Sequence, residues 1–476
     1  MATDQKQCGF RKSRRTIDMI FAARQLQEKC QEQHQDLYTT FVDLTKAFDT
    51  VSREGLWRIM EKFGCPSKFI NMVRQFHDGM QARVLDNGDC SETFSVTNGV
   101  KQGCVLAPTL FSMMFTAMLS DAFYDDHDTC IGFRYRTDGR LLNALRLQAK
   151  TKVEKYWVCD LFADDCALNA TTEAKMQQSM DRFASSCTNF GLTISTKKTE
   201  VMFQPAPQQR YSEPSITVKG ETLKAVDNFT YLGSTISRSV NIDTEVDTRI
   251  AKASSAFGRL RVSVWDRRGI KLSTKLKVYK AAVLPTLLYA CETWTVYERH
   301  AKKLNRFHIN CLRQLLKINW KDRIPDTDVL DQAGMTSIHT LLRRAQLRWA
   351  GHIVRMQDTR LPKRLLYGEL VHGIRSRGRP KLRFKDTLKA SLKNFGIDVK
   401  KWEALTHDRS SWRSCVGEGA ASYEQSRISG AQKKRELRKS RGNSEVHNSA
   451  EHMCLICGRA FRARIGLISH SRTHDS

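Results

Sequence analysis

Two aspartates stand side by side at Asp164 and Asp165, in the middle of the apolar stretch DLFADDCAL, residues 160–168. Adjacent carboxylates repel each other and lose hydration among apolar neighbours, so such a pair needs a compensating positive charge. A divalent cation is the usual solution, and magnesium prefers carboxylate and phosphate oxygens. Exposed turns also contain Asp-Asp often, but the apolar flanks favour the tip of a hairpin that faces a ligand. The pair is therefore a candidate for half of a magnesium site.

Asp43 is the candidate partner of this pair. The run Leu37–Val42 (LYTTFV) is β-branched and aromatic, which predicts a strand that ends directly at Asp43. Open sheets place functional groups at strand ends that point at a cleft. Aspartate also favours the position that caps a helix, and residue type alone does not separate these two interpretations.

A second constellation lies near the C-terminus, in CLICGRAFRARIGLISHSRTH. Its possible ligands follow the spacing Cys454-x2-Cys457-x12-His470-x3-His474, with Phe461 and Leu467 at the two hydrophobic positions of a ββα unit. Two thiolates and two imidazoles at this spacing give tetrahedral zinc, and so short a segment folds only with its metal. The alternative is chance spacing in a disordered tail. Residues 451–476 resemble a Cys2His2 zinc finger and predict one structural zinc ion.

The helix of this finger offers little for reading bases. Counting back from His470, helix positions −1, 3 and 6 are Ala463, Gly466 and Ser469. Alanine and glycine carry no side-chain donor, and serine discriminates poorly between base edges. We therefore expect the finger to bind nucleic acid with little sequence preference, or to dock a protein. The candidate phosphate contacts are Arg459, Arg462 and Arg464.

The charge of the whole chain points to a polyanionic partner. The 476 residues carry 78 Lys and Arg against 50 Asp and Glu, a formal net charge of +28. Lysines and arginines that neutralise phosphates release condensed counterions, so nucleic acid is the leading partner. The alternative is a basic surface that only confers solubility.

Cysteine usage and hydropathy exclude two other classes. The 14 cysteines are mostly scattered singly and the first residues, MATDQKQCGFRKSRR, contain no apolar signal core, which predicts free thiols in a reducing compartment. The longest uncharged run, Cys104–Ser120, is shorter than the roughly 20 residues of a membrane span. We expect it to be a buried helix entered through Pro108.

The elements that position these residues change character along the chain. The first half mixes strand and helix signals irregularly, which predicts an α+β domain. It includes a turn at Asp138-Gly139 between strand-like residues of Ile131–Leu142, and amphipathic stripes at residues 56–63, 69–76 and 176–190. Gly64 and Gly191 would end the first and the last of these helices. Residues 242–412 become helical and basic, 413–450 suggest a basic linker that is disordered or transiently helical, and 451–476 close the chain.

Five motifs in order then resemble a known family. They are FVDLTKAFD (41–49), NGVKQGCVLAP (98–108), LFADD (161–165), GLTISTKKTEVM (191–202) and YLG (231–233). Their order and spacing are similar to the reverse transcriptase of non-LTR, LINE-type retrotransposons. The resemblance covers roughly residues 7–236 and continues more loosely to about residue 412.

The resemblance implies a right-hand polymerase fold. Residues 1–236 would form partial fingers and the palm, 237–412 a mostly helical thumb or connection, and 451–476 a small ββα finger. The fingers region normally found upstream is expected to be missing, and so is an endonuclease domain. The implied activity is RNA-directed DNA synthesis, with an RNA template, a DNA primer and deoxynucleoside triphosphates as partners.

The resemblance also assigns roles to residues. Asp43, Asp164 and Asp165 match the ligands of two Mg²⁺ ions, which activate a primer 3′-hydroxyl and stabilise the leaving pyrophosphate. Lys198 matches a lysine proposed to protonate pyrophosphate, although it could only steady phosphate charge. Phe48 matches the position that excludes a ribose 2′-hydroxyl, with core packing as its alternative. The remaining matches are Gln102 and Gly103 for template and nucleotide, Tyr231, Leu232 and Gly233 for the primer, and Arg11, Lys12, Arg14 and Arg15 for the triphosphate.

Two other functions stay open at this stage. The chain could be a catalytically inert copy that binds nucleic acid, because the loss of positioning elements removes much of the rate of phosphoryl transfer. It could also be a zinc-finger regulator with a vestigial polymerase fold. In each case we expect a nuclear or cytoplasmic ribonucleoprotein, not a secreted protein.

Overall fold

A computed structural model describes residues 14–101, 103–123, 128–138, 140–148, 152–162, 166–373, 381–443, 452–461 and 464–474. The chain divides into two compact units, residues 1–421 and 422–476. The candidate polymerase motifs all belong to the first unit, and the Cys/His spacing belongs to the second.

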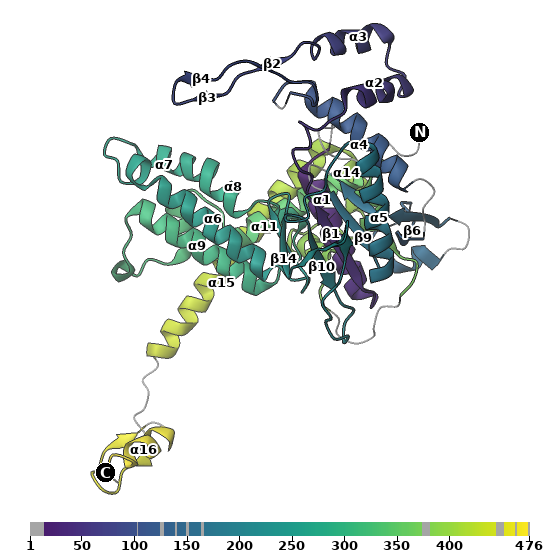
Figure 1. Cartoon of the computed structure of the whole chain (residues 1–476). Helices are drawn as coiled ribbons and strands as arrows, with labels where there is room; N and C mark the ends of the chain where they lie inside the picture. Colours follow the sequence, from purple (N-terminus) through teal and green to yellow (C-terminus); the bar gives the residue numbers. More distant parts are fainter. Residues whose placement is uncertain are drawn as a thin grey trace. The chain divides into compact units, whose positions relative to one another are not determined.

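A five-stranded sheet forms the centre of the first unit (Figure 1). Its order is β13 (Lys224–Ala225), β10 (Glu200–Gln204), β1 (Leu37–Val42), β9 (Cys166–Ala170) and β8 (Asp160–Phe162). Only β13 runs parallel to its neighbour. The strand predicted at Leu37–Val42 is confirmed, and all six of its residues are buried.

Both faces of this sheet are covered, because side chains along a strand alternate between the two faces. Tyr38 and Val42 face a core built on α4 (Ala107–Phe123), α5 (Glu173–Asn189), α2 (Arg53–Lys62) and α3 (Ser67–Gln75). Leu37 and Phe41 face a second core, built on α1 (Thr16–Glu32) and the hairpin of β14 (Asn228–Tyr231) and β15 (Ser234–Ser237). Strands and helices mixed in this way confirm the α+β class.

Several local predictions are confirmed by the helices. The apolar run with Pro108 is the buried helix α4. Gly64 and Gly191 follow α2 and α5 with φ of 78° and 73°, the left-handed conformation that ends a helix. Small hairpins lie outside the main sheet: β2 (Gln81–Ala82) with β5 (Phe94–Ser95), β3 (Leu85–Asp86) with β4 (Asp89–Cys90), and β11 (Thr217–Val218) with β12 (Glu221–Thr222).

A three-stranded sheet corrects one prediction. β6 (Ile131–Tyr135) pairs with β7 (Glu154–Val158) and β16 (Glu369–Leu370). The connection from β6 to β7 contains Asp138, and Gly139 of the expected turn lies outside the described residues. The intervening residues include the 3-10 turn Ala144–Gln148. Free thiols were predicted, but Cys130 and Cys159, which flank β6 and β7, form a disulfide. Strand pairing brings them together, and their spacing along the chain did not reveal it.

The region from Asp243 to His407 is helical, as predicted. Its α-helices are α6 (Asp243–Arg259), α7 (Leu272–Val278), α8 (Leu284–Leu287), α9 (Glu298–Leu316), α10 (Asp326–Gln332), α11 (Ile338–Val354), α12 (Leu361–Tyr367), α13 (Phe384–Asn394) and α14 (Trp402–His407), with short turns at Arg261–Trp265, Tyr279–Val283, Cys291–Thr293 and Trp320–Asp322. Helices α6 to α11 enclose a third apolar core. No helix within the described part of the chain is long and apolar enough to span a membrane.

Buried polar groups on α1 join the two halves of this first unit. Asp18 pairs with Arg360 at 2.5 Å, and the Glu32 carboxylate pairs with Arg383 at 2.9 Å. Lys29 donates to the Gly368 carbonyl at 2.6 Å. Because these partners lie beyond residue 236, the segment that carries the polymerase motifs is packed together with the C-terminal helices.

The second unit contains the end of α15 (Arg409–Asn443) and a small ββα element of β17 (His452–Met453), β18 (Ala460–Phe461) and α16 (Arg464–Ser471). A linker, disordered or transiently helical, was expected over residues 413–450. Residues up to Asn443 belong to one helix, 409–443, and residues 444–450 lie outside the described residues. The first part of this helix buries Trp412, Val416 and Ala420. Such burial stabilises a helix that composition alone does not predict.

Candidate active site

The ends of three strands meet at one edge of the central sheet. Val42, the last residue of β1, pairs with Cys166, the first residue of β9. Cys166 also pairs with Phe162, where β8 ends. The predicted pair Asp164 and Asp165 lies outside the described residues, between the ends of β8 and β9. The predicted hairpin around this pair is confirmed by the pairing of its two strands.

Asp43 follows β1 at this same edge, and its backbone is fixed on both sides. Its N–H donates to the Thr199 hydroxyl at 3.2 Å, and its carbonyl accepts from the Ser195 N–H at 2.9 Å. Its carboxylate keeps 40% of its surface exposed and lies 3.6 Å from the Lys198 ammonium, which is 74% exposed. The predicted residues Asp43 and Lys198 are thus brought together, with the acid accessible to a ligand.

The motif at 98–108 packs directly behind Phe48. The Val100 N–H donates to the Phe48 carbonyl at 2.9 Å, and the Phe48 ring stacks on Phe111 at a centroid distance of 4.5 Å. Gly99 has a φ of 83°, and a Cβ there would lie 2.5 Å from the Asp49 carbonyl oxygen, so only glycine allows this approach. The loop at Gly99 and Val100 is therefore packed closely against the backbone of Phe48 and Asp49.

Of the two predicted nucleotide contacts in this loop, Gly103 is described by the structure. Gly103 has a φ of 91° and open space around its α-carbon. Gln102 lies outside the described residues. Phe48 is partly buried against the core around Phe111, so its ring both packs and keeps an exposed side.

The YLG motif forms the two-residue turn between β14 and β15. Leu232 and Gly233 have φ of 48° and 79°, as a type I′ hairpin turn requires. Tyr231 is fully buried, and its hydroxyl donates to the Leu161 carbonyl of β8 at 3.1 Å. The Tyr231 side chain thus ties this turn to β8, the strand that precedes Asp164. Leu232 and Gly233 form the accessible part of the turn.

Sequence reasoning missed the charged network that holds this turn. Glu245, fully buried, accepts from the Ser234 hydroxyl at 3.0 Å, the Thr235 N–H at 2.6 Å and Arg249 Nε at 3.0 Å. Arg249 also donates to the Gly233 carbonyl. Arg24 of α1 donates to the Ser234 hydroxyl at 3.0 Å, and burial lowers the pKa of its guanidinium.

A signal for this network existed in the sequence. Glu245 and Arg249 are four residues apart beside the apolar positions Val246 and Ala253 of α6. Charges at that spacing on a buried stripe indicate an ion pair inside the fold.

The basic residues expected to hold the triphosphate are only partly described. Arg11 and Lys12 lie outside the described residues. Arg14 and Arg15 precede α1, where Arg14 lowers the pKa of Asp18 and Arg15 lowers that of Glu292. Burial dominates both acids and leaves their pKa raised. The acids that these two arginines influence lie in α1 and in the turn Cys291–Thr293.

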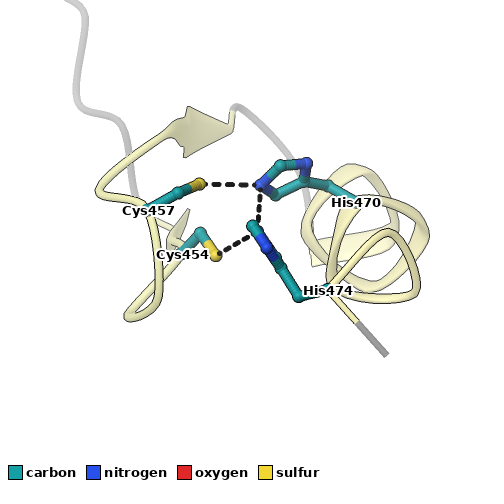
Figure 2. Close-up of side chains that lie close together, drawn as sticks. All are labelled: Cys454, Cys457, His470 and His474. Carbon is teal, nitrogen blue, oxygen red and sulfur yellow. Dashed lines mark hydrogen bonds between the residues drawn. The ribbon is translucent and has the colours of Figure 1, made fainter. Parts of the chain in front are cut away.

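In the second unit, the four predicted metal ligands converge (Figure 2). The ligand atoms of Cys454, Cys457, His470 and His474 all lie within 4.8 Å of one another. Cys457 Sγ lies 3.0 Å from His470 Nε2, and Cys454 Sγ lies 3.5 Å from His474 Nε2. These atoms form a cluster that could hold a metal ion.

The surroundings of the cluster suit metal binding. The backbone N–H groups of Cys457 and Ile456 lower the pKa of the Cys454 thiol, which favours the thiolate form. Burial and the neighbouring His474 lower the pKa of His470, which keeps the imidazole neutral. The Phe461 ring packs 4.8 Å from the His470 ring. Arg459 and Arg464 are exposed beside the cluster, and Arg462 and Ala463 lie outside the described residues.

Comparisons with known proteins agree with the motif order. Residues 1–236 match the family model "Reverse transcriptase (RNA-dependent DNA polymerase)". A putative uncharacterized transposon-derived protein of Caenorhabditis elegans is 25% identical over 270 residues, which cover 54% of this chain and 93% of that protein. The RNA-directed DNA polymerase from mobile element jockey of Drosophila funebris is 24% identical over 324 residues, 68% of this chain and 33% of that polymerase.

Comparison with solved structures finds distant neighbours, one of which is a telomerase. Telomerase from Candida tropicalis, solved with a fragment of telomeric RNA, aligns with a TM-score of 0.34 and 11% identity over 87% of this chain and 53% of that one. The family match rests on sequence: residues 1–236 of this chain are similar to the reverse transcriptase family.

Proposed function

We propose that this chain is an RNA-directed DNA polymerase of the non-LTR retrotransposon type, which extends a DNA primer along an RNA template. One observation carries the proposal: Val42, the chain neighbour of Asp43, pairs with Cys166, the chain neighbour of Asp165. The residues that flank Asp43 and Asp165 in the chain thus lie at one end of the sheet, and in this proposal Asp43, Asp164 and Asp165 would hold two Mg²⁺ ions. The ions would activate the primer 3′-hydroxyl and stabilise the leaving pyrophosphate.

The chain's own residues supply positioning around that edge. Asp43 fits a cation site, because its carboxylate is accessible while both of its backbone groups are bonded. Lys198 would protonate the leaving pyrophosphate or neutralise its charge. Phe48 would exclude a ribose 2′-hydroxyl, with Gln102 and Gly103 beside the template and nucleotide. Arg11, Lys12 and Arg14 would contact the triphosphate.

The β14–β15 turn completes the proposed right-hand palm. Leu232 and Gly233 would contact the primer backbone, and the buried Tyr231 would position them relative to β8. In this proposal the helices of residues 237–412 serve as thumb or connection. The network of Arg24, Glu245 and Arg249 keeps the turn rigid from both sides.

Primer extension on an RNA template with Mg²⁺ tests the proposal. We expect the full chain to incorporate deoxynucleotides, and Asp43→Asn and the double variant Asp164→Ala, Asp165→Ala to lose incorporation. Asp331→Asn, an exposed acid at the end of α10, is the matched control and should retain it. Equal incorporation by the double variant and the control would overturn the proposal. RNA binding without extension by the wild type would instead identify a nucleic-acid-binding protein.

We further propose that Cys454, Cys457, His470 and His474 bind one structural zinc ion. The convergence of two sulfur and two imidazole donors supports it, because this donor set matches tetrahedral zinc. The finger would then act as an additional nucleic-acid contact in a nuclear or cytoplasmic ribonucleoprotein. If deletion of residues 451–476 abolishes target choice and leaves primer extension intact, the finger selects the target. If the deletion also abolishes extension, the finger is not limited to target selection.

A further inference from the structure

A second charged site lies away from the residues assigned to catalysis, where the C-terminal region folds back on α1. A cavity of about 430 Å³ opens between the end of α1, the segment Arg134–Leu147, β16 and the start of α13. This volume falls within the roughly 300–1,000 Å³ of pockets that hold small ligands. Five cationic and three acidic side chains line it. We call it the α1–α13 pocket.

The three acids of the α1–α13 pocket are already paired. Glu32 and Asp386 both bind Arg383, at 2.9 Å and 3.0 Å. Glu369 lies between two lysines, 2.8 Å from Lys385 Nζ and 3.3 Å from Lys29 Nζ. One carboxylate thus serves two ammonium groups, and the pocket keeps a surplus of positive charge.

The other three cations increase this surplus. Arg134, Arg146 and Lys389 form no ion pair with an acidic residue in the described part of the chain. Arg146 is 6% exposed, and among the described residues it donates to the carbonyl groups of Arg136 and Tyr367, while Glu369 and Glu403 act on it electrostatically without an ion pair. Arg134 and Lys389 are exposed at the mouth of the pocket, so they can reach a ligand without disturbing the core.

Positive groups in such a setting need an anion. Buried ammonium and guanidinium groups are costly without a counter-charge, and Lys29 and Lys385 are both buried. Burial and the neighbouring Lys29 lower the pKa of Lys385 to about 8, although Glu369 raises it. Phosphate oxygens accept hydrogen bonds from lysine ammonium groups and, in pairs, from the arginine guanidinium, and both kinds of cation line this pocket.

We infer that the α1–α13 pocket binds a phosphate group, and that in the working protein this is a phosphodiester of the RNA strand. Leu141, Leu142 and Leu147 form an apolar side of the pocket, against which a sugar or base can pack. The choice of RNA rests on the proposed function, whereas the phosphate site rests on the charges alone. The pocket would anchor RNA to the joint between α1 and the C-terminal helices.

The test removes the two cations at the mouth. In the full chain, Arg134→Ala with Lys389→Ala is compared with Arg210→Ala with Lys252→Ala, which removes the same charge from exposed sites elsewhere. Anisotropy of a labelled single-stranded RNA is measured against NaCl without Mg²⁺ or nucleotide. Each phosphate contact to a single strand contributes about −0.7 to the slope of log affinity against log salt. Because the pocket variant loses two such contacts, its slope should be less steep than that of the wild type by about 1.4. The slope of the control variant should change clearly less.

A second arm identifies the source of the phosphate. Adenosine monophosphate and inorganic phosphate are titrated by calorimetry into wild type and both double variants. Weak binding that disappears only in the pocket variant supports the phosphate site. If that occurs while the RNA slope stays unchanged, the source is a free nucleotide and the RNA assignment is overturned. If pocket and control variants behave alike toward all three ligands, the phosphate site is overturned.

This result is separable from the proposed polymerase activity. Asp43→Asn should bind RNA with the wild-type salt slope and fail to extend a primer. If the wild type fails to extend a primer while the pocket variant still shows the weaker salt dependence of RNA binding, the proposed function is overturned and the phosphate site is not. Unchanged thermal midpoints of both double variants exclude a folding defect, since all four substituted residues are exposed.

Discussion

The Lys198 ammonium lies 3.6 Å from the Asp43 carboxylate, across the ladder that joins β10 to β1. Both residues stand two positions beyond the Phe41–Glu200 pair, the last pair of this ladder, and Lys198 belongs to the turn that leads into β10. An acid that would hold metal and a cation that would meet pyrophosphate are thus positioned by the end of β1 and by this turn, whose Ser195 N–H donates to the Asp43 carbonyl.

This relationship predicts that Lys198 matters for rate and little for stability. Lys198→Met should lower the extension rate about 100-fold, the lower end of the effect of a general acid. Its thermal midpoint should hardly change, because an exposed ion pair contributes only about 0–1 kcal/mol. Lys224→Met removes a comparably exposed lysine paired with Glu200 and is the control. Lys198→Arg keeps the charge, so full activity in that variant would contradict proton donation and leave only charge neutralisation.

Tyr231→Phe should uncouple the β14–β15 turn from β8. The variant loses the hydrogen bond to the Leu161 carbonyl and leaves that buried oxygen short of a donor, at a cost of about 1–3 kcal/mol. We expect lower unfolding free energy in urea and a higher KM for the primer. Tyr289→Phe removes a bond of 2.9 Å to the Leu232 carbonyl from the other side of the same turn and serves as comparison. An unchanged primer KM in Tyr231→Phe would remove the tyrosine from primer positioning.

Metal removal should affect the two units separately. All 8 tryptophans of the chain precede residue 422, so tryptophan fluorescence reports only the first unit. A strong zinc chelator should release about one zinc per chain and leave that fluorescence unchanged. Cys457→Ser should be purified with little zinc, while Cys415→Ser, at a thiol outside the cluster, should retain it. Zinc retained by Cys457→Ser would show that the cluster is not the site.

Glu28 should make the stability of the first unit depend on pH. Burial raises the pKa of this carboxyl to about 7, despite hydrogen bonds from the Phe384 N–H at 2.7 Å and the Thr295 hydroxyl at 3.0 Å. The folded state therefore binds a proton more tightly than the unfolded chain, whose ordinary value is 4.5. Its stabilising contribution is present below about 4.5 and is lost as pH rises through about 7.

The measurement is urea unfolding between pH 5 and 8. Glu28→Gln should remove a fall in unfolding free energy on the order of 3 kcal/mol across that window. Glu213→Gln, at an exposed acid, should keep the wild-type slope. Identical slopes for wild type and Glu28→Gln would show that Glu28 does not titrate in that range.

The parts of the fold that the sequence predicted well are those set by local pattern. β-branched residues predicted β1, apolar stripes predicted α2 and α5, and the glycines after these helices predicted their ends. The convergence of Cys454, Cys457, His470 and His474 was also predictable, because all four lie in one short segment.

The parts that escaped prediction depend on contacts between distant residues. The disulfide of Cys130 and Cys159 needs the pairing of β6 with β7. The network of Glu245 and Arg249 depends on a contact between α6 and the β14–β15 turn, whose Gly233 carbonyl accepts from Arg249. Residues 413–450 were predicted to be a disordered or transiently helical linker from their polar composition, whereas residues 409–443 form a helix whose first part buries Trp412 and Val416.

The short strand β16 has a consequence for how the chain reaches this structure. A ribosome delivers β6 more than 200 residues before Glu369 and Leu370 can cover its edge. Until then the nascent chain exposes an open strand edge, a ready template for pairing with a neighbouring molecule. Expression of residues 1–236 alone should therefore yield aggregates, and chaperone demand during synthesis should end only once the downstream helices have emerged.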